Sequence, residues 1–128
     1  MSLRGISIVL LLIGMSSTHI TAQNLATYRW QKRLLLIFAP TDKHADCQEQ
    51  LKIKADNIAA FEERDLITVV IKDEKWYKKY GVKPNEFVVI LIGKDGSPKI
   101  RDFRPFTMQR LITIIDAMPM RQDEMKRH

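Results

Sequence analysis

The stretch that decides the fold reads Arg33-Leu-Leu-Leu-Ile-Phe-Ala-Pro-Thr-Asp-Lys-His-Ala-Asp-Cys47. Its apolar run from Leu34 to Ala39 is typical of a strand buried on both faces, and Pro40 ends that strand. A polar loop follows, and the only cysteine of the chain, Cys47, stands where an amphipathic pattern begins. In α/β proteins, a loop that joins a strand to a helix often carries binding or catalytic groups. The sequence therefore indicates this loop as the candidate site.

The pattern that begins near Cys47 predicts a helix from Ala45 to about Glu63. Apolar residues recur there at helical steps and share one face, which we expect to be buried. These positions are Cys47, Leu51, Ala55 and Ile58. Thr41 and Asp42 are the residue types that cap helix N-termini, so we expect one of them to cap this helix.

The rest of the chain alternates between strand-like and helix-like segments. The predicted strands are Leu66–Ile71, Phe87–Ile92 and Lys99–Phe103; the predicted helices are Asp73–Tyr80 and Met108–Met118, followed by a charged tail, Met120–His128. The aromatic residues expected to cover the core are Tyr28, Trp30, Trp76 and Tyr80. Gly81 fits the end of the second helix, and Asp95-Gly96 predicts a tight hairpin between the last two strands.

The order of these elements predicts the fold. A strand, a helix and a strand at this spacing form a βαβ unit with parallel strands. The antiparallel hairpin and a final helix then complete the arrangement found in thioredoxins. We predict a single α/β domain of thioredoxin-like fold, with a mixed four-stranded sheet, over residues 23–128.

The N-terminal residues 1–22 have the features of a signal peptide. Arg4 supplies a positive charge, Ile6 to Met15 form an apolar segment too short to span a bilayer, and Ala22 suits a cleavage site. We expect cleavage near Gln23 and export to the periplasm or the extracellular space. An uncleaved N-terminal anchor is the alternative.

The mature chain would carry 20 Lys and Arg residues against 15 Asp and Glu residues, because Arg4 is the only charged residue lost. The charges are interleaved and accompany no recognition motif, which argues against nucleic-acid binding. We expect no membrane contact apart from the signal peptide. The expected partner is an unknown protein or another acidic extracellular molecule, bound at the loop Pro40–Asp46 or at a basic hairpin. The basic residues of that hairpin region are Lys94, Lys99, Arg101 and Arg104.

Three segments resemble one known family. They are Tyr28–Pro40, the segment Val89-Ile-Leu-Ile-Gly-Lys-Asp-Gly-Ser-Pro-Lys-Ile-Arg101, and Ile115-Asp-Ala-Met-Pro-Met-Arg-Gln-Asp-Glu-Met125. They are similar to the domain of unknown function 4174 family, found in exported bacterial proteins and in extracellular matrix proteins related to sushi-repeat proteins. The resemblance implies a thioredoxin-like domain in an exported protein. It implies no activity.

Thiol chemistry is the activity that this fold most often supports. The loop before Cys47 lacks a second cysteine, so the Cys-x-x-Cys pair of a dithiol oxidoreductase is missing. Peroxiredoxins are similar in another respect: Pro40, His44 and Cys47 match the spacing of their Pro-x-x-x-Thr-x-x-Cys segment, with His44 in place of threonine. In a one-cysteine thiol peroxidase, Cys47 would react with the peroxide as a thiolate. His44 and an arginine, such as Arg101 or Arg104, would complete the site, and the arginine would stabilise the thiolate.

The alternative for Cys47 is a buried, inert thiol, because it shares its helix face with core residues. A thiol paired between two chains is a third reading, since one cysteine cannot form an internal disulfide. Asp42, His44 and Asp46 are spaced as weak metal ligands, but they more closely fit capping and loop residues. We expect no cofactor and no metal, and we predict a non-catalytic interaction module, with the Cys47 peroxidase as the alternative.

Overall fold

The computed structural model describes residues 25–127, so the predicted signal peptide, residues 1–22, lies outside the described residues. The elements in chain order are η1 (Ala26–Tyr28), β1 (Arg33–Phe38), α3 (Ala45–Asp56), α4 (Ile58–Glu63), β2 (Leu66–Val70), α5 (Glu74–Tyr80), β3 (Val88–Ile92), β4 (Pro98–Asp102), α6 (Met108–Asp116) and α7 (Pro119–Lys126). Each predicted strand is present, with bounds that differ by one residue at one or both ends.

The four strands form one mixed sheet in the order β2-β1-β3-β4. Strands β1 and β2 are parallel and are joined through α3 and α4, which confirms the predicted βαβ unit. Strand β3 is antiparallel to both β1 and β4, which confirms the predicted hairpin. The hairpin turn contains Gly96 at φ +84°, a left-handed conformation that glycine adopts without strain. The predicted thioredoxin-like α/β fold is therefore the observed one.

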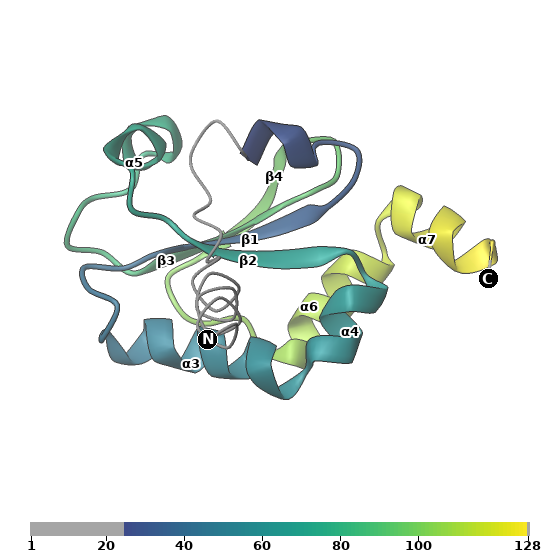
Figure 1. Ribbon diagram of the computed structural model, residues 1–128, viewed down its shortest axis with the longest axis horizontal. Coiled ribbons are helices and arrows are strands. Elements are labelled where there is room, and N and C mark those ends of the chain that lie inside the picture. Colours follow the sequence, from purple (N-terminus) through teal and green to yellow (C-terminus); the bar gives the residue numbers. More distant parts are fainter. Residues whose placement is uncertain (1–24, 128) are drawn as a thin grey trace, which may run out of the picture.

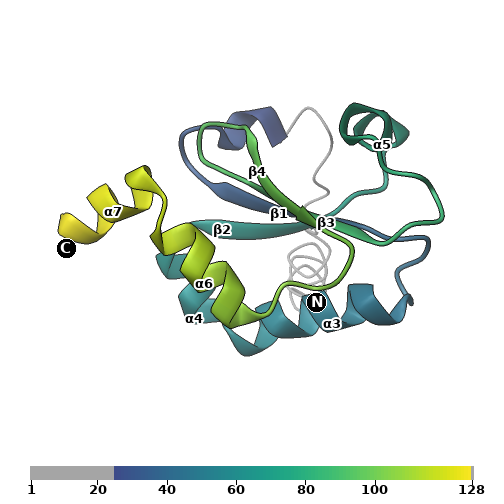
Figure 2. The same ribbon diagram turned by 180° about the vertical axis from the view of Figure 1, so that it is seen from behind.

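The two central strands, β1 and β3, are buried on both faces. Side chains alternate along a strand, so each of these strands contributes to the core on either side of the sheet. In β1, Leu35 and Ile37 face the layer formed by α3, α4 and α6, whereas Leu34, Leu36 and Phe38 face α5 and η1. Figures 1 and 2 show these two layers on opposite sides of the sheet. An apolar run with no polar alternation is the expected sequence of such a strand.

The predicted single helix over residues 45–63 is wrong in one respect: it is divided at Asn57. Asn57 has φ −136° and ψ 37°, outside the helical region, so α3 ends and α4 starts in a new direction. Ile58 therefore leaves the buried face and is 53% exposed, and Ala55 is also exposed. The predicted caps are wrong as well. The N-cap of α3 is His44, whose side chain accepts a hydrogen bond from the Asp46 amide.

Helix α5 agrees with its prediction. Asp73 caps its N-terminus, and Gly81 ends it in a left-handed conformation at φ 64°. Trp76 and Tyr80 pack against the core as expected. Trp30 does not: it lies in a turn at φ 71° and is 58% exposed, so its predicted role in covering the core is wrong.

The predicted charged tail is a helix. Pro119 occupies the first turn of α7, where a missing amide hydrogen costs nothing, so it starts the helix instead of only ending α6. Arg121 of α7 is buried and binds the Asp116 and Glu63 carboxylates. Within residues 25–127, no helix combines the length and the apolar character that a membrane span requires.

Candidate functional site

The candidate site is the segment that joins β1 to α3 and contains the first turn of α3. His44 is held there by two contacts: its Nδ1 accepts from the Asp46 amide at 3.2 Å, and its ring stacks on Phe87 at 5.6 Å between ring centroids. The two rings are within 4° of parallel. His44 therefore caps the N-terminus of α3 and packs the loop against Phe87. Its Nδ1 atom is already occupied by the hydrogen bond from the Asp46 amide.

Cys47 is fully buried, at 0% exposure, in the core between the sheet and α3. Burial raises the pKa of its thiol; the negative charge of Asp42 raises it further, and the positive charge of Lys72 lowers it only in part. A raised pKa keeps the group as a protonated thiol, which is neither a nucleophile nor a metal ligand. These are the surroundings of a small hydrophobic side chain.

Arg101 lies on the other face of the sheet. In the β3–β4 ladder it is the direct partner of Ile90, and directly opposed residues point to the same face. Ile90 belongs to the core cluster beneath α5, whereas Cys47 belongs to the cluster beneath α3. The Arg101 guanidinium accordingly donates to the Tyr80 carbonyl at the end of α5. His44 and Cys47 both lie at the start of α3, Arg101 lies on the other face of the sheet, and Arg104 is exposed beyond the end of β4.

Two of the three residues weighed as metal ligands, Asp42 and His44, are engaged in hydrogen bonds of their own. The Asp42 carboxylate accepts from Lys72, and its backbone carbonyl accepts from Gln48. His44 is used as the helix cap, and Asp46 lies in the first turn of α3. In the part of the chain that the structure describes, no group of three or more His, Cys, Asp or Glu residues could hold a metal ion.

A cavity of about 530 Å³ opens beside this loop on the α5 side. Pro40 and Thr41 line it, together with Tyr77 and Val82, whereas Cys47 is not among its described lining residues. Tyr77 donates to the Ala39 carbonyl at 3.3 Å, which fixes α5 to the end of β1. The exposed end of the β1–α3 connection is therefore concave, but the thiol does not reach it.

The predicted basic hairpin surface needs one correction. Lys94 is buried, and its ammonium group binds the carboxylates of Asp65 at 2.8 Å and Glu124 at 2.7 Å. Lys94 therefore forms structural ion pairs and is not available to a partner. Lys99 pairs with Asp95 on the hairpin at 2.9 Å, at a partly exposed position.

A second concave region was not foreseen from the sequence. It lies between η1 and α5, over the sheet face opposite Cys47, and its described lining includes Arg29 and Lys79. Hydrogen bonds from the Ser97 amide and the Lys99 ammonium lower the pKa of Asp95, on the rim, to about 2. The available sequence signal was the helical spacing of Trp76, Lys79 and Tyr80. The opposite wall comes from a distant segment, and only the folded chain places the two together.

Comparisons with known proteins agree with the fold. A family model described as "Domain of unknown function (DUF4174)" matches residues 24–124. Among solved structures, a reduced 2-Cys peroxiredoxin from Plasmodium vivax is similar with a TM-score of 0.63 at 17% identity, over 77% of this chain and 84% of that chain. The mitochondrial 2-Cys peroxiredoxin from Plasmodium falciparum is similar with a TM-score of 0.56 at 17% identity, over 73% of this chain and 79% of that one. At this level of identity, these two likenesses establish the fold alone.

Proposed function

The chain belongs to the DUF4174 family, and from this premise we propose that it is a non-catalytic, thioredoxin-like interaction module. The observation that supports the proposal is the state of Cys47: its side chain is fully buried and its thiol pKa is raised. A reactive cysteine requires access to solvent and a lowered pKa. The position at which this fold commonly carries thiols is here filled by a core residue.

The alternative activity is a one-cysteine thiol peroxidase. Such an enzyme would oxidise the Cys47 thiolate to a sulfenic acid while peroxide is reduced, and an external thiol would then restore the cysteine. The spacing of Pro40, His44 and Cys47 supports this reading. The burial of the thiol and the position of Arg101 on the opposite face weigh against it.

Peroxide consumption distinguishes the two functions. The wild-type chain and Cys47→Ala are compared with hydrogen peroxide and an excess of dithiothreitol, with folding verified by circular dichroism. We expect both chains to consume peroxide at the rate of the buffer. Turnover by the wild type that Cys47→Ala abolishes would replace the interaction module with the peroxidase.

We extend the proposal to an acidic partner that binds the exposed hairpin side. Arg101 and Arg104 are exposed there, and Lys99 is partly exposed, so the surface keeps a basic character without Lys94. A heparin column measures the attraction to a polyanion as the salt concentration needed for elution. Arg101→Gln/Arg104→Gln is expected to elute at lower salt than Lys75→Gln/Lys83→Gln, which removes the same charge elsewhere. Equal elution of the two double variants would contradict this partner surface.

We also propose that the protein is exported. The supporting feature is the sequence of residues 1–22. Arg4 precedes the apolar segment Ile6–Met15, and Ala22, the last of these residues, suits a cleavage site. Expression of the full chain in a bacterial host, followed by mass measurement of the periplasmic fraction, tests this. A product that begins near Gln23 is expected. A full-length product confined to the cytoplasm would contradict export.

A further inference from the structure

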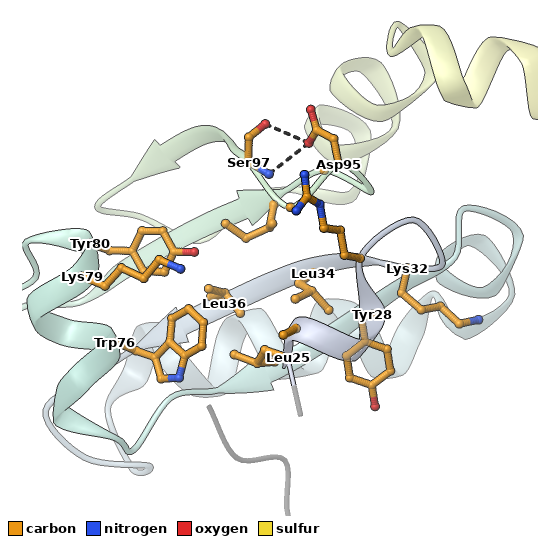
Figure 3. A pocket seen from close by; sticks show the side chains of 15 residues that line it. Leu25, Tyr28, Lys32, Leu34, Leu36, Trp76, Lys79, Tyr80, Asp95 and Ser97 are labelled. Atoms are coloured by element: carbon orange, nitrogen blue, oxygen red, sulfur yellow. Dashed lines mark hydrogen bonds between the residues drawn. The ribbon is translucent and has the colours of Figure 1, made fainter. Parts of the chain in front are cut away.

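The groove between η1 and α5 has the shape and the lining of a binding site for a small molecule. Its volume is about 450 Å³, within the range of about 300–1,000 Å³ typical of ligand sites. Leu34 and Leu36 of β1 line it together with Leu25 and Trp76, and Figure 3 shows these side chains close to one another. The sheet thus contributes an apolar floor.

One wall of the groove is aromatic and carries a positive charge. Trp76 and Tyr80 stack at 5.7 Å between ring centroids, with 13° between their planes. The Lys79 ammonium lies 4.7 Å from the centroid of the Trp76 ring. An aromatic wall of this kind offers contact area to an aliphatic or aromatic body, and Lys79 holds a cation over the Trp76 ring.

The charges around the groove are not balanced. Within residues 25–127, neither Arg29 nor Lys79 contacts a carboxylate; their contacts are with aromatic rings. The one acidic residue in the described lining, Asp95, is already bound on both oxygens. Its Oδ1 accepts from the amide and the hydroxyl of Ser97, shown as dashed lines in Figure 3, and its Oδ2 accepts from Lys99. The groove therefore favours an anion over a cation or a neutral molecule.

We propose that this groove binds an amphiphilic organic anion, a small molecule with one anionic group and an apolar body. The body lies over Leu34 and against the half-buried rings of Trp76 and Tyr80. The anionic group lies at the rim, within the field of Arg29 and Lys79. The apolar contact supplies most of the affinity, and the two cations select the sign of the head group.

This site goes beyond the proposed function, and the two can fail separately. Leu34 and Leu36 belong to the core cluster beneath α5, whereas Cys47 belongs to the cluster on the other face. Ligand binding in the groove therefore does not depend on whether the thiol reacts. Peroxide turnover would overturn the non-catalytic reading and leave the groove proposal intact.

Decanoate is a suitable probe, with decan-1-ol and butyrate as matched ligands that lack the charge or most of the body. The chain contains two tryptophans, so Trp30→Phe leaves Trp76 as a single fluorescent reporter in the groove wall. In this variant we expect decanoate to change the Trp76 emission in a saturable manner. Butyrate should bind at least about a hundredfold more weakly, since it lacks six methylene groups. Decan-1-ol should bind about fivefold more weakly than decanoate.

Two variants test the location of the site, with binding followed by calorimetry. Arg29→Gln/Lys79→Gln is expected to weaken decanoate binding about fivefold and to leave decan-1-ol unaffected. Its control is Lys75→Gln/Lys83→Gln, which removes two exposed charges outside the groove. Ala26 is exposed and lines the groove, so Ala26→Phe should fill it without disturbing the core. Ala59→Phe places the same side chain on an exposed position of α4.

Four results would overturn the proposal. The first is no saturable decanoate binding by a chain whose circular dichroism shows it to be folded. The second is decan-1-ol binding as tightly as decanoate. The third is decanoate binding unchanged both by Ala26→Phe and by the loss of Arg29 and Lys79 charge. The fourth is displacement of decanoate by a leucine- and aspartate-rich peptide at lower concentration, which would assign the groove to an acidic polypeptide.

Discussion

Arg33 and Glu124 form a two-point ion pair between residues that are 91 positions apart in the chain. The Nη1 and Nη2 atoms of Arg33 donate to Oε1 and Oε2 of Glu124, each at 3.1 Å. Arg33 is fully buried at the start of β1, and Glu124 lies in α7 with its side chain 17% exposed. Lys94 of the β3–β4 turn binds the same carboxylate. The pair therefore fixes the C-terminal helix to the sheet.

Loss of the Glu124 charge is expected to destabilise the fold. Glu124→Gln leaves the Arg33 and Lys94 cations near each other without their shared carboxylate, and removing one partner of a buried ion pair costs about 3 kcal/mol. Urea unfolding monitored by circular dichroism measures this free energy. Asp123→Asn is the control, because Asp123 is exposed on the same helix, and it should change stability by less than about 0.5 kcal/mol. Equal stability of the two variants would show that the ion pair between Arg33 and Glu124 does not stabilise the fold.

The same carboxylates predict sensitivity to acid. Burial by itself would raise the pKa of Glu124, but hydrogen bonds and positive charge from Arg33 and Lys94 outweigh it and hold the pKa below the ordinary value of 4.5. The pKa of Asp116 is lowered in the same manner: burial by itself would raise it, but the hydrogen bonds from Arg64 and Arg121 outweigh that effect. The unfolded chain then takes up protons first as the pH falls. The stabilisation is complete above pH 4.5 and is lost as the pH falls through the folded pKa values.

Urea midpoints at pH 7, 4.5 and 3 check the acid prediction. The wild type should lose stability mainly below pH 4.5, and Glu124→Gln should show a shallower decrease because one of the linked groups is absent. A midpoint that stays constant between pH 7 and pH 3 would show that these carboxylates have the same pKa values in the folded and unfolded chains.

Gln50 predicts a second point of vulnerability. Its buried side-chain amide pairs with both backbone groups of Phe106: Nε2 donates to the carbonyl at 3.1 Å, and Oε1 accepts from the amide at 2.7 Å. Gln50→Ala leaves two buried backbone groups without partners, so we expect a loss of about 3 kcal/mol in the free energy of unfolding. Gln109→Ala, at an exposed position of α6, should be nearly neutral. A loss below about 0.5 kcal/mol for Gln50→Ala would indicate that solvent replaces both bonds.

The sheet could be predicted from the sequence because its signal is local. The unbroken apolar runs of β1 and β3 require burial on both faces, and the Asp95-Gly96 pair specifies the hairpin. Gly81 likewise indicated the end of α5, because glycine readily adopts the left-handed conformation that it has there. These features depend on residues within a few positions of one another, so their pattern was sufficient.

The charged residues could not be placed in this way. Lys94 and Arg121 look like surface residues in the sequence, but both are buried, and each binds a carboxylate from a distant segment: Asp65 for Lys94 and Glu63 for Arg121. The turn at Asn57 moved Ile58 to the surface, although its spacing matched the buried face. The groove depends on η1 and α5 packing on the same face of the sheet, a long-range arrangement that has no local pattern.

Oxidation of Cys47 in the folded chain tests most directly whether this thiol is buried and inert. The full chain is treated with a small excess of hydrogen peroxide in buffer or in 8 M urea (roughly the concentration that unfolds small domains), and its intact mass is followed with time. We expect no peroxide-dependent oxygen addition at Cys47 in buffer, and faster addition in urea once the thiol is exposed. Cys47→Ala identifies additions at other residues. Rapid addition of one oxygen to Cys47 in the folded wild type would contradict a buried, non-catalytic thiol.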